Sequence, residues 1–162
     1  MTTTDRSGVI IRRSGEGERR WFFGGGEHIW KATAAETGGA FILFEDVLEQ
    51  GKVTPWHSHP DSAESLYVLE GEIVLRVGEE DHTVGAGGFV YLPVGVAHAF
   101  RVTSPMARLL ALVAPGTAEA FYRRASEVAG EQPGVVDFGR IRAAAVETGV
   151  IDVLGPPPFR RD

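Results

Sequence analysis

The chain has 162 residues, of which 43% are hydrophobic, and its formal net charge is −6. This length and composition suit one compact globular domain, and the acidic balance argues against a nucleic-acid partner. Cysteine is absent, which excludes disulfides and thiolate metal ligands. The first residues do not resemble a signal sequence and no apolar run is long enough to span a bilayer, so we expect a soluble cytoplasmic protein that does not insert into membranes.

The first part of the chain predicts two regions. Residues 1–20 are polar, rich in glycine and arginine and without sustained periodicity, which indicates an N-terminal tail or an edge strand ordered by a partner. In residues 21–116, short apolar runs such as AFILFEDV, SLYVLEG and EIVLRVG alternate with glycine, proline and acidic turns. That pattern is typical of an all-β antiparallel barrel. Residues 78–81, GEED, separate two such runs and predict a hairpin turn.

Two histidines and a glutamate follow one another inside the barrel region. A single residue separates His57 from His59, so on a strand both imidazoles point to the same side. Glu64 begins the next apolar strand after a Pro-Asp turn. The inward face of that strand is predicted to hold Glu64, Leu66 and Val68.

A third histidine begins another predicted strand further along the chain. His98 follows a Pro-Val-Gly turn, and its strand is expected to place His98, Phe100 and Val102 on one face. Three imidazoles and a carboxylate from neighbouring strands would suit one divalent transition metal, with an open position for water or substrate. Iron, manganese, nickel, cobalt, copper and zinc all remain candidates. His28 and His82 lie outside this pattern and are expected to be surface or hydrogen-bonded residues.

The last part of the chain, residues 117–162, predicts a short helical extension and a proline-rich tail. Thr117 can cap a helix that ends at Gly130, and Asp137 can cap a second helix that ends at Gly149. The apolar stripes of the two helices would be Phe121, Ala125 and Val128 in the first, and Phe138, Ile141 and Ala145 in the second. We expect these helices to cover outer barrel surface or a dimer partner, and the alternative is a lid over the barrel mouth.

The spacing of these residues resembles the two signature motifs of the cupin superfamily. The first is GKVTPWHSHPDSAESLYVLEG at residues 51–71, and the second lies in GGFVYLPVGVAHAF at residues 87–100. This resemblance implies a double-stranded β-helix, the jelly-roll barrel of cupins. Cupins usually carry an asparagine four positions after the second-motif histidine, where this chain has Val102, which implies a more apolar floor of the barrel.

A narrower resemblance covers most of residues 30–130. The order of GGAFILFE, the two motifs, RLLALVAPG and AFYRR is similar to that of bacterial quercetin dioxygenase-like monocupins. The resemblance implies a homodimer that exchanges or pairs N-terminal strands, and dioxygen insertion into a flavonol-type ring. It also implies that His57, His59 and His98 hold the metal, with Glu64 as fourth ligand and general base.

The predicted substrate pocket follows from the inward faces of the two motif strands. Phe100 is the main candidate, together with Leu66, Val68 and Val102, whereas Phe41, Phe44 and Tyr91 are expected in the core. The predicted function is a metal-dependent dioxygenase that acts on a small aromatic or enolisable compound. Two alternatives stay open: a redox-neutral metal-dependent isomerase, cyclase or lyase, and a non-catalytic small-molecule-binding cupin.

Overall fold

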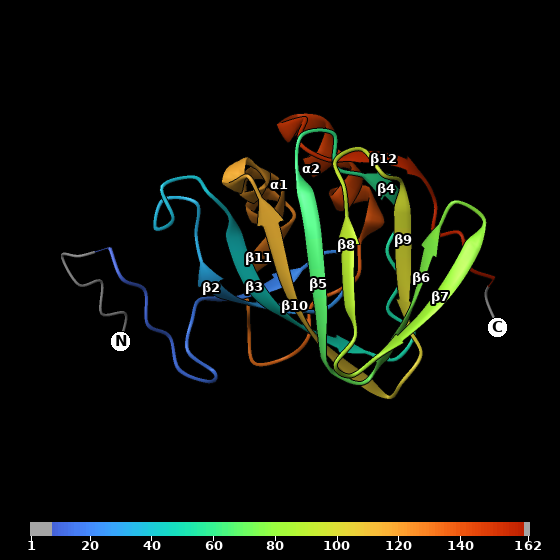
Figure 1. The fold of residues 1–162 in the computed structure, drawn as a ribbon, viewed down its shortest axis with the longest axis horizontal. Helices are drawn as coiled ribbons and strands as arrows, with labels where there is room; N and C mark the ends of the chain where they lie inside the picture. The colour runs from blue at the N-terminus through green and yellow to red at the C-terminus, as the bar shows by residue number, and fades with distance from the viewer. Residues whose placement is uncertain (1–7, 161–162) are drawn as a thin grey trace.

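Two antiparallel sheets face each other in the computed structural model, which describes residues 8–160 (Figure 1). The seven-stranded sheet has the order β11 (Ser126–Val128), β1 (Arg19–Phe22), β2 (Glu27–Ala32), β3 (Ile42–Glu49), β10 (Met106–Ala114), β5 (Ala63–Glu70) and β8 (Phe89–Leu92). The five-stranded sheet has the order β12 (Asp152–Gly155), β4 (Trp56–Ser58), β9 (His98–Val102), β6 (Glu72–Val77) and β7 (Glu80–Gly85). The expected all-β double-stranded β-helix is therefore confirmed.

The core forms because the strands alternate apolar and polar residues. Along β10, every second residue from Ala107 to Val113 is buried, and the residues between them are half-buried. On β3 the same alternation turns Ile42, Phe44 and Leu48 inward. Burial of such side chains stabilises the fold by about 1.5–3 kcal/mol for each large aliphatic or aromatic residue. The inner faces of the two sheets therefore enclose one shared core.

The turns before and after β6 differ in how tightly their glycines are packed. The β6–β7 hairpin is confirmed, with Val77 paired to Glu80 and a two-residue turn of Gly78 and Glu79 between them. Gly71, which joins β5 to β6, has φ +80°, and a Cβ built there would lie 2.1 Å from the carbonyl oxygen of Met106. Gly78 also has positive φ, +60°, but open space surrounds its Cβ position.

We expect Gly71→Ala to destabilise the protein by about 3 kcal/mol. An alanine there would have to adopt the unfavourable left-handed conformation, and its Cβ would also collide with the backbone of Met106. Gly78→Ala is the matched control and should cost only about 1–2 kcal/mol, the backbone contribution alone. Urea unfolding of the two variants measures the difference. Equal losses would show that the contact with Met106 is relieved by a small backbone shift.

The first C-terminal helix is shorter than expected. A 3-10 turn, η1 (Gly116–Ala118), leads into α1 (Glu119–Arg124), and residues up to Val128 then form β11. The predicted cap at Thr117 and the helical stripe through Val128 are therefore wrong, and Val128 is 73% exposed. The physical reason is tertiary, since β11 pairs with the open edge of β1 and supplies backbone partners that a longer helix would not.

The second C-terminal helix agrees with its sequence signals. Helix α2 (Phe138–Thr148) begins after Asp137, whose side chain accepts a hydrogen bond of 3.1 Å from the backbone N–H of Arg140. It ends at Gly149, which adopts the left-handed conformation with φ +67°. The extension also contributes β11 and β12, one to each sheet. Within residues 8–160, no helix is long and apolar enough to cross a membrane.

The N-terminal region was expected to be a tail or a partner-ordered strand, and its first seven residues lie outside the described part of the chain. Residues 8–18 contact their own chain, since the Arg12 guanidinium forms an ion pair of 2.6 Å with Glu36. The strand that follows, β1, pairs with β2 on one side and β11 on the other. Its hydrogen bonding is therefore satisfied within one chain.

Candidate metal centre

The four sequence-predicted donors meet at one end of the barrel. His57 lies on β4 and faces His98, the first residue of β9, across the β4–β9 pair. His59 follows directly after β4, and Glu64 is the second residue of β5. One potential ligand atom from each of these residues lies within 4.8 Å of the others. The cluster could therefore bind a metal ion through groups from strands of both sheets.

Backbone carbonyls orient two of the imidazoles. Nδ1 of His57 lies 2.7 Å from the carbonyl oxygen of Pro55, and Nδ1 of His98 lies 2.9 Å from that of Val96. A carbonyl oxygen only accepts, so Nδ1 must carry the hydrogen in both rings. In the neutral ring Nε2 then presents a lone pair to the centre of the cluster. This is the tautomer and the ring support that metal-binding histidines use.

The centre of the cluster brings together acceptor atoms that a proton or a metal ion has to join. Oε2 of Glu64 lies 3.0 Å from Nε2 of His98 and 3.1 Å from Nε2 of His59. His59 is 3% exposed, and within the described part of the chain neither of its ring nitrogens has a hydrogen-bond partner. Buried polar atoms without partners are unfavourable by about 1–3 kcal/mol each. The donor set therefore fits a divalent transition metal, which would take up these lone pairs together.

The electrostatics of the cluster favour the metal-binding forms of His57 and Glu64 near neutral pH, but not that of His98. Burial, together with the nearby imidazoles of His98 and His59, lowers the pKa of His57 to about 3. Burial alone would raise the pKa of Glu64, but His59 and His98 hold it well below its usual range. Glu64 in turn raises the pKa of His98 despite burial. A proton on His98 and a metal would occupy the same position, so metal binding is expected to release that proton.

A largely apolar cavity of about 60 Å³ adjoins the cluster. Phe100, expected in the substrate pocket, lines this cavity, but Leu66, Val68 and Val102 do not and are buried in the core instead. Phe44, expected only in the core, also lines it. Tyr91 was expected in the core and is 58% exposed on β8, so that expectation is wrong.

The C-terminal extension closes one side of the cavity. Figure 1 shows α1, α2, β4 and β12 at the same end of the barrel, with α2 between α1 and the two strands. Their side chains complete the cavity wall, with Phe121 and Tyr122 from α1, Ile141 from α2, Ile151 before β12 and Val153 within it. The expectation that these helices only cover outer surface is therefore corrected. Both helices line the cavity, which agrees with the alternative expectation of a lid over the barrel mouth.

The cavity wall also contains polar residues that the sequence patterns did not place there, among them His28, Asp46 and Lys52. His28 is 2% exposed and its Nδ1 has no hydrogen-bond partner among residues 8–160, so the expected surface position is wrong, whereas His82 is exposed as expected. Burial lowers the pKa of His28 to about 3 and raises that of Asp46 to about 7, the latter against the effect of Lys52. A signal was present, because Asp46 falls on the alternating apolar face of β3.

Comparison with known proteins agrees with the geometry. The Cupin domain family matches residues 44–115. Quercetin 2,3-dioxygenase of Bacillus subtilis (strain 168) is 34% identical over 115 residues, which are 69% of this chain and 33% of that protein. The chain belongs to the cupin superfamily. It spans a third to a half of the length of the curated relatives it matches, so the activity of the longer enzyme does not follow from the likeness alone.

Solved structures of other cupins share the fold. A candidate ethanolamine utilization protein of Salmonella typhimurium LT2 has a TM-score of 0.61 at 22% identity, over 72% of this chain and 94% of its own. A sugar phosphate isomerase of the cupin superfamily from Silicibacter pomeroyi DSS-3 has a TM-score of 0.55 at 20% identity, over 64% of this chain and 75% of its own. At these identities the likeness shows the fold, and function has to be argued from the site.

Proposed function

We propose that this cupin is a metal-dependent dioxygenase that acts on a small aromatic or enolisable compound. His57, His59, His98 and Glu64 would hold one divalent transition metal. The observation that carries the proposal is the convergence of these four donors within 4.8 Å at the wall of an aromatic-lined cavity. The similarity to the Bacillus subtilis quercetin dioxygenase supports the dioxygen chemistry.

The chemistry divides between the metal and the chain. A bound divalent metal supplies Lewis acidity at an open coordination position and, when it is redox-active, electron exchange with dioxygen. Glu64 is ionised near neutral pH, so its carboxylate can take the proton of a substrate hydroxyl. Phe44 and Phe100 present aromatic surface to a planar substrate, and side chains of the C-terminal extension keep water away from it.

The volume of the cavity favours small substrates over large ones. Sites that hold drug-sized ligands measure about 300–1,000 Å³, several times the 60 Å³ found in this barrel. A compound with one ring therefore needs less displacement of the lining side chains than a three-ring flavonol does. We accordingly propose one-ring enols, phenols and diketones as the first substrates to test.

The direct test is dioxygen uptake by protein reconstituted separately with iron, manganese, nickel, cobalt, copper and zinc. The panel combines one-ring enols and phenols, diketones and flavonols. Uptake that needs both metal and compound supports the dioxygenase. Turnover of the same compound without dioxygen would assign the redox-neutral isomerase, cyclase or lyase class instead. Binding that survives removal of the metal, without any turnover, would assign a binding module.

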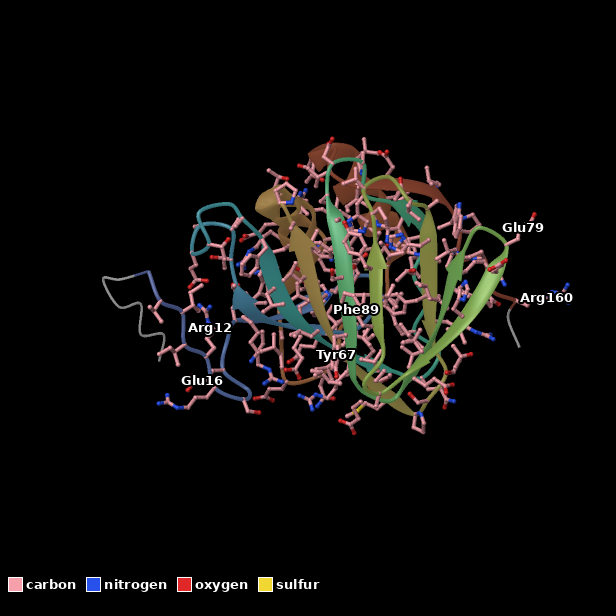
Figure 2. All side chains as sticks on the ribbon, viewed as in Figure 1. Arg12, Glu16, Tyr67, Glu79, Phe89 and Arg160 are labelled. Carbon is pink, nitrogen blue, oxygen red and sulfur yellow. The ribbon has the colours of Figure 1, made fainter. Side chains whose placement is uncertain are left out.

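We also propose a homodimer, as the resemblance implies, and the outer face of β5 and β8 supports a second copy as the partner. Tyr67 on β5 faces Phe89 on β8, and their side chains are 43% and 62% exposed (Figure 2). Strand β8 is also the last strand of its sheet, so its outer edge is available for pairing.

We expect Phe89→Lys to reduce the mass in solution from twice 17.5 kDa to the single-chain value, because a lysine on each copy places charge in the apolar contact. Size-exclusion chromatography with light scattering measures the mass. Val146→Lys, at an 81% exposed position on α2, is the control and should leave the mass unchanged. A variant that remains paired would place the contact on another face.

A further inference from the structure

Two polar side chains in the cavity wall have atoms without a hydrogen-bond partner among residues 8–160. His28 and Asp46 are 2% and 8% exposed. Nδ1 of His28 and Oδ1 of Asp46 are both buried without a hydrogen-bond partner. Such atoms are unfavourable in the folded state, so they indicate a function or a ligand that the protein itself does not supply.

The two side chains are held in place although they do not satisfy each other. They form a cross-strand pair on β2 and β3, and Nε2 of His28 lies 3.6 Å from Oδ1 of Asp46, too far for a good hydrogen bond. The imidazole is stacked between the rings of Phe22 and Phe44, at centroid distances of 4.7 and 4.2 Å. The two aromatic rings therefore hold the imidazole of His28 and its nitrogen atoms in a fixed position.

Lys52 does not neutralise this pair by direct contact. Its ammonium group donates to the carbonyl oxygen of Gly24 and lies 5.0 Å from the centroid of the Phe22 ring. Among the ion pairs of residues 8–160, none joins Lys52 to Asp46. The Asp46 carboxylate thus has no contact with a cationic side chain at this end of the cavity.

The pair lies apart from the candidate metal centre. Along the sheet, Asp46 is in the same row of inward side chains as Leu109 and Val68, whereas Glu64 is in the row of Val113. One row of inward side chains separates the two. The His28–Asp46 pair and the candidate metal centre nevertheless line the same cavity, together with Phe44 and other aromatic residues.

We propose that His28 and Asp46 form a second subsite, which binds a hydroxyl group of the substrate at the end of the cavity remote from the histidine–glutamate cluster. A hydroxyl group both donates and accepts, so it can donate to Oδ1 of Asp46 and also pair with an imidazole nitrogen of His28. A carboxylate or phosphate would be repelled by the ionised form of Asp46. This subsite rests on the proposed function and narrows it to a small planar enol or phenol that bears a hydroxyl group on its opposite side.

Two hydroxypyranones provide a matched pair of probes. Kojic acid and allomaltol share the same enol head and differ only in a hydroxymethyl group in place of a methyl group. Calorimetry on the zinc-loaded protein measures their binding without oxidation, because zinc has no redox chemistry. We expect wild-type protein to bind kojic acid about tenfold more tightly than allomaltol, the effect of one buried hydrogen bond.

Variants locate the origin of that preference. Asp46→Leu keeps a similar volume without polar atoms and should bind the two compounds alike. Should this variant not fold, His28→Phe keeps the stack with Phe22 and Phe44 and should show the same loss. Glu45→Gln is the matched control, because Glu45 is on the same strand, equally buried and paired with Arg108 outside the cavity. It should retain the preference.

Each contrary result has a distinct meaning. Equal binding of the two compounds by wild-type protein that holds zinc would overturn the subsite and leave the metal centre intact. A preference for kojic acid that survives both Asp46→Leu and His28→Phe would also overturn it. Wild-type protein that neither holds zinc nor binds either compound would overturn the proposed metal centre and the subsite with it.

Discussion

Protein purified as His59→Ala is expected to have lost most of its metal, with an affinity at least about 100-fold below that of wild type. The reason is that His59 offers a buried ring whose nitrogens have no partner in the protein. Its removal deletes one of four converging donors. Elemental analysis after dialysis against each candidate metal measures the change.

The fold should survive this substitution. His59 is not part of the apolar core, so we expect its removal to lower the free energy of unfolding of metal-free protein by only about 1–3 kcal/mol, through the lost interaction with the Glu64 carboxylate. His82→Ala is the matched control, because that imidazole is 52% exposed on β7 and lies outside the cluster. Full metal occupancy in His59→Ala would contradict the ligand assignment.

The second large effect is expected on turnover, from Glu64→Gln. An amide retains the shape of the side chain but cannot take up a proton, so the rate of dioxygen uptake should fall by about 100- to 10,000-fold. The three histidines remain, and saturating metal compensates for the weaker binding. Steady-state rates and metal content, measured on the same samples, separate loss of the base from loss of the metal.

A neighbouring glutamate controls for the change of charge. Glu70 ends the same strand as Glu64, and its carboxylate pairs with Arg108 at 3.6 Å on the outside of the barrel. Glu70→Gln should retain wild-type turnover. If Glu64→Gln, fully loaded with metal, turned over within about twofold of wild type, Glu64 would not be the base, because a positioned base contributes far more than that.

The metal donors could be predicted from the sequence because their geometry is local in origin. One residue between His57 and His59 places both on the same side of a strand, and the positions of Glu64 and His98 at strand starts bring them to the same end of the barrel. The second C-terminal helix was predictable for a similar reason. Asp137 and Gly149 satisfy its terminal backbone groups within a few residues of each end.

The sequence predictions that proved wrong concern residues whose structure depends on contacts with residues distant in sequence. The helix expected through Val128 gives way to β11, because β1, more than 100 positions earlier in the chain, offers it an open edge. His28 was expected to be a surface or hydrogen-bonded residue, yet its ring is stacked between Phe22 and Phe44. Neither outcome follows from periodicity, since both depend on which segments the barrel brings together.

By itself, the sequence determined the barrel class, the four donors and the capped second helix, because strand alternation and helix capping act over a few neighbouring residues. Only the tertiary structure decided that α1, α2 and β12 wall in the cavity and that it is small. It also decided that Asp46 is buried with His28 at its far end. The physical reason is that a cavity exists only between segments, so its size and its unsatisfied atoms appear when distant strands and helices pack together.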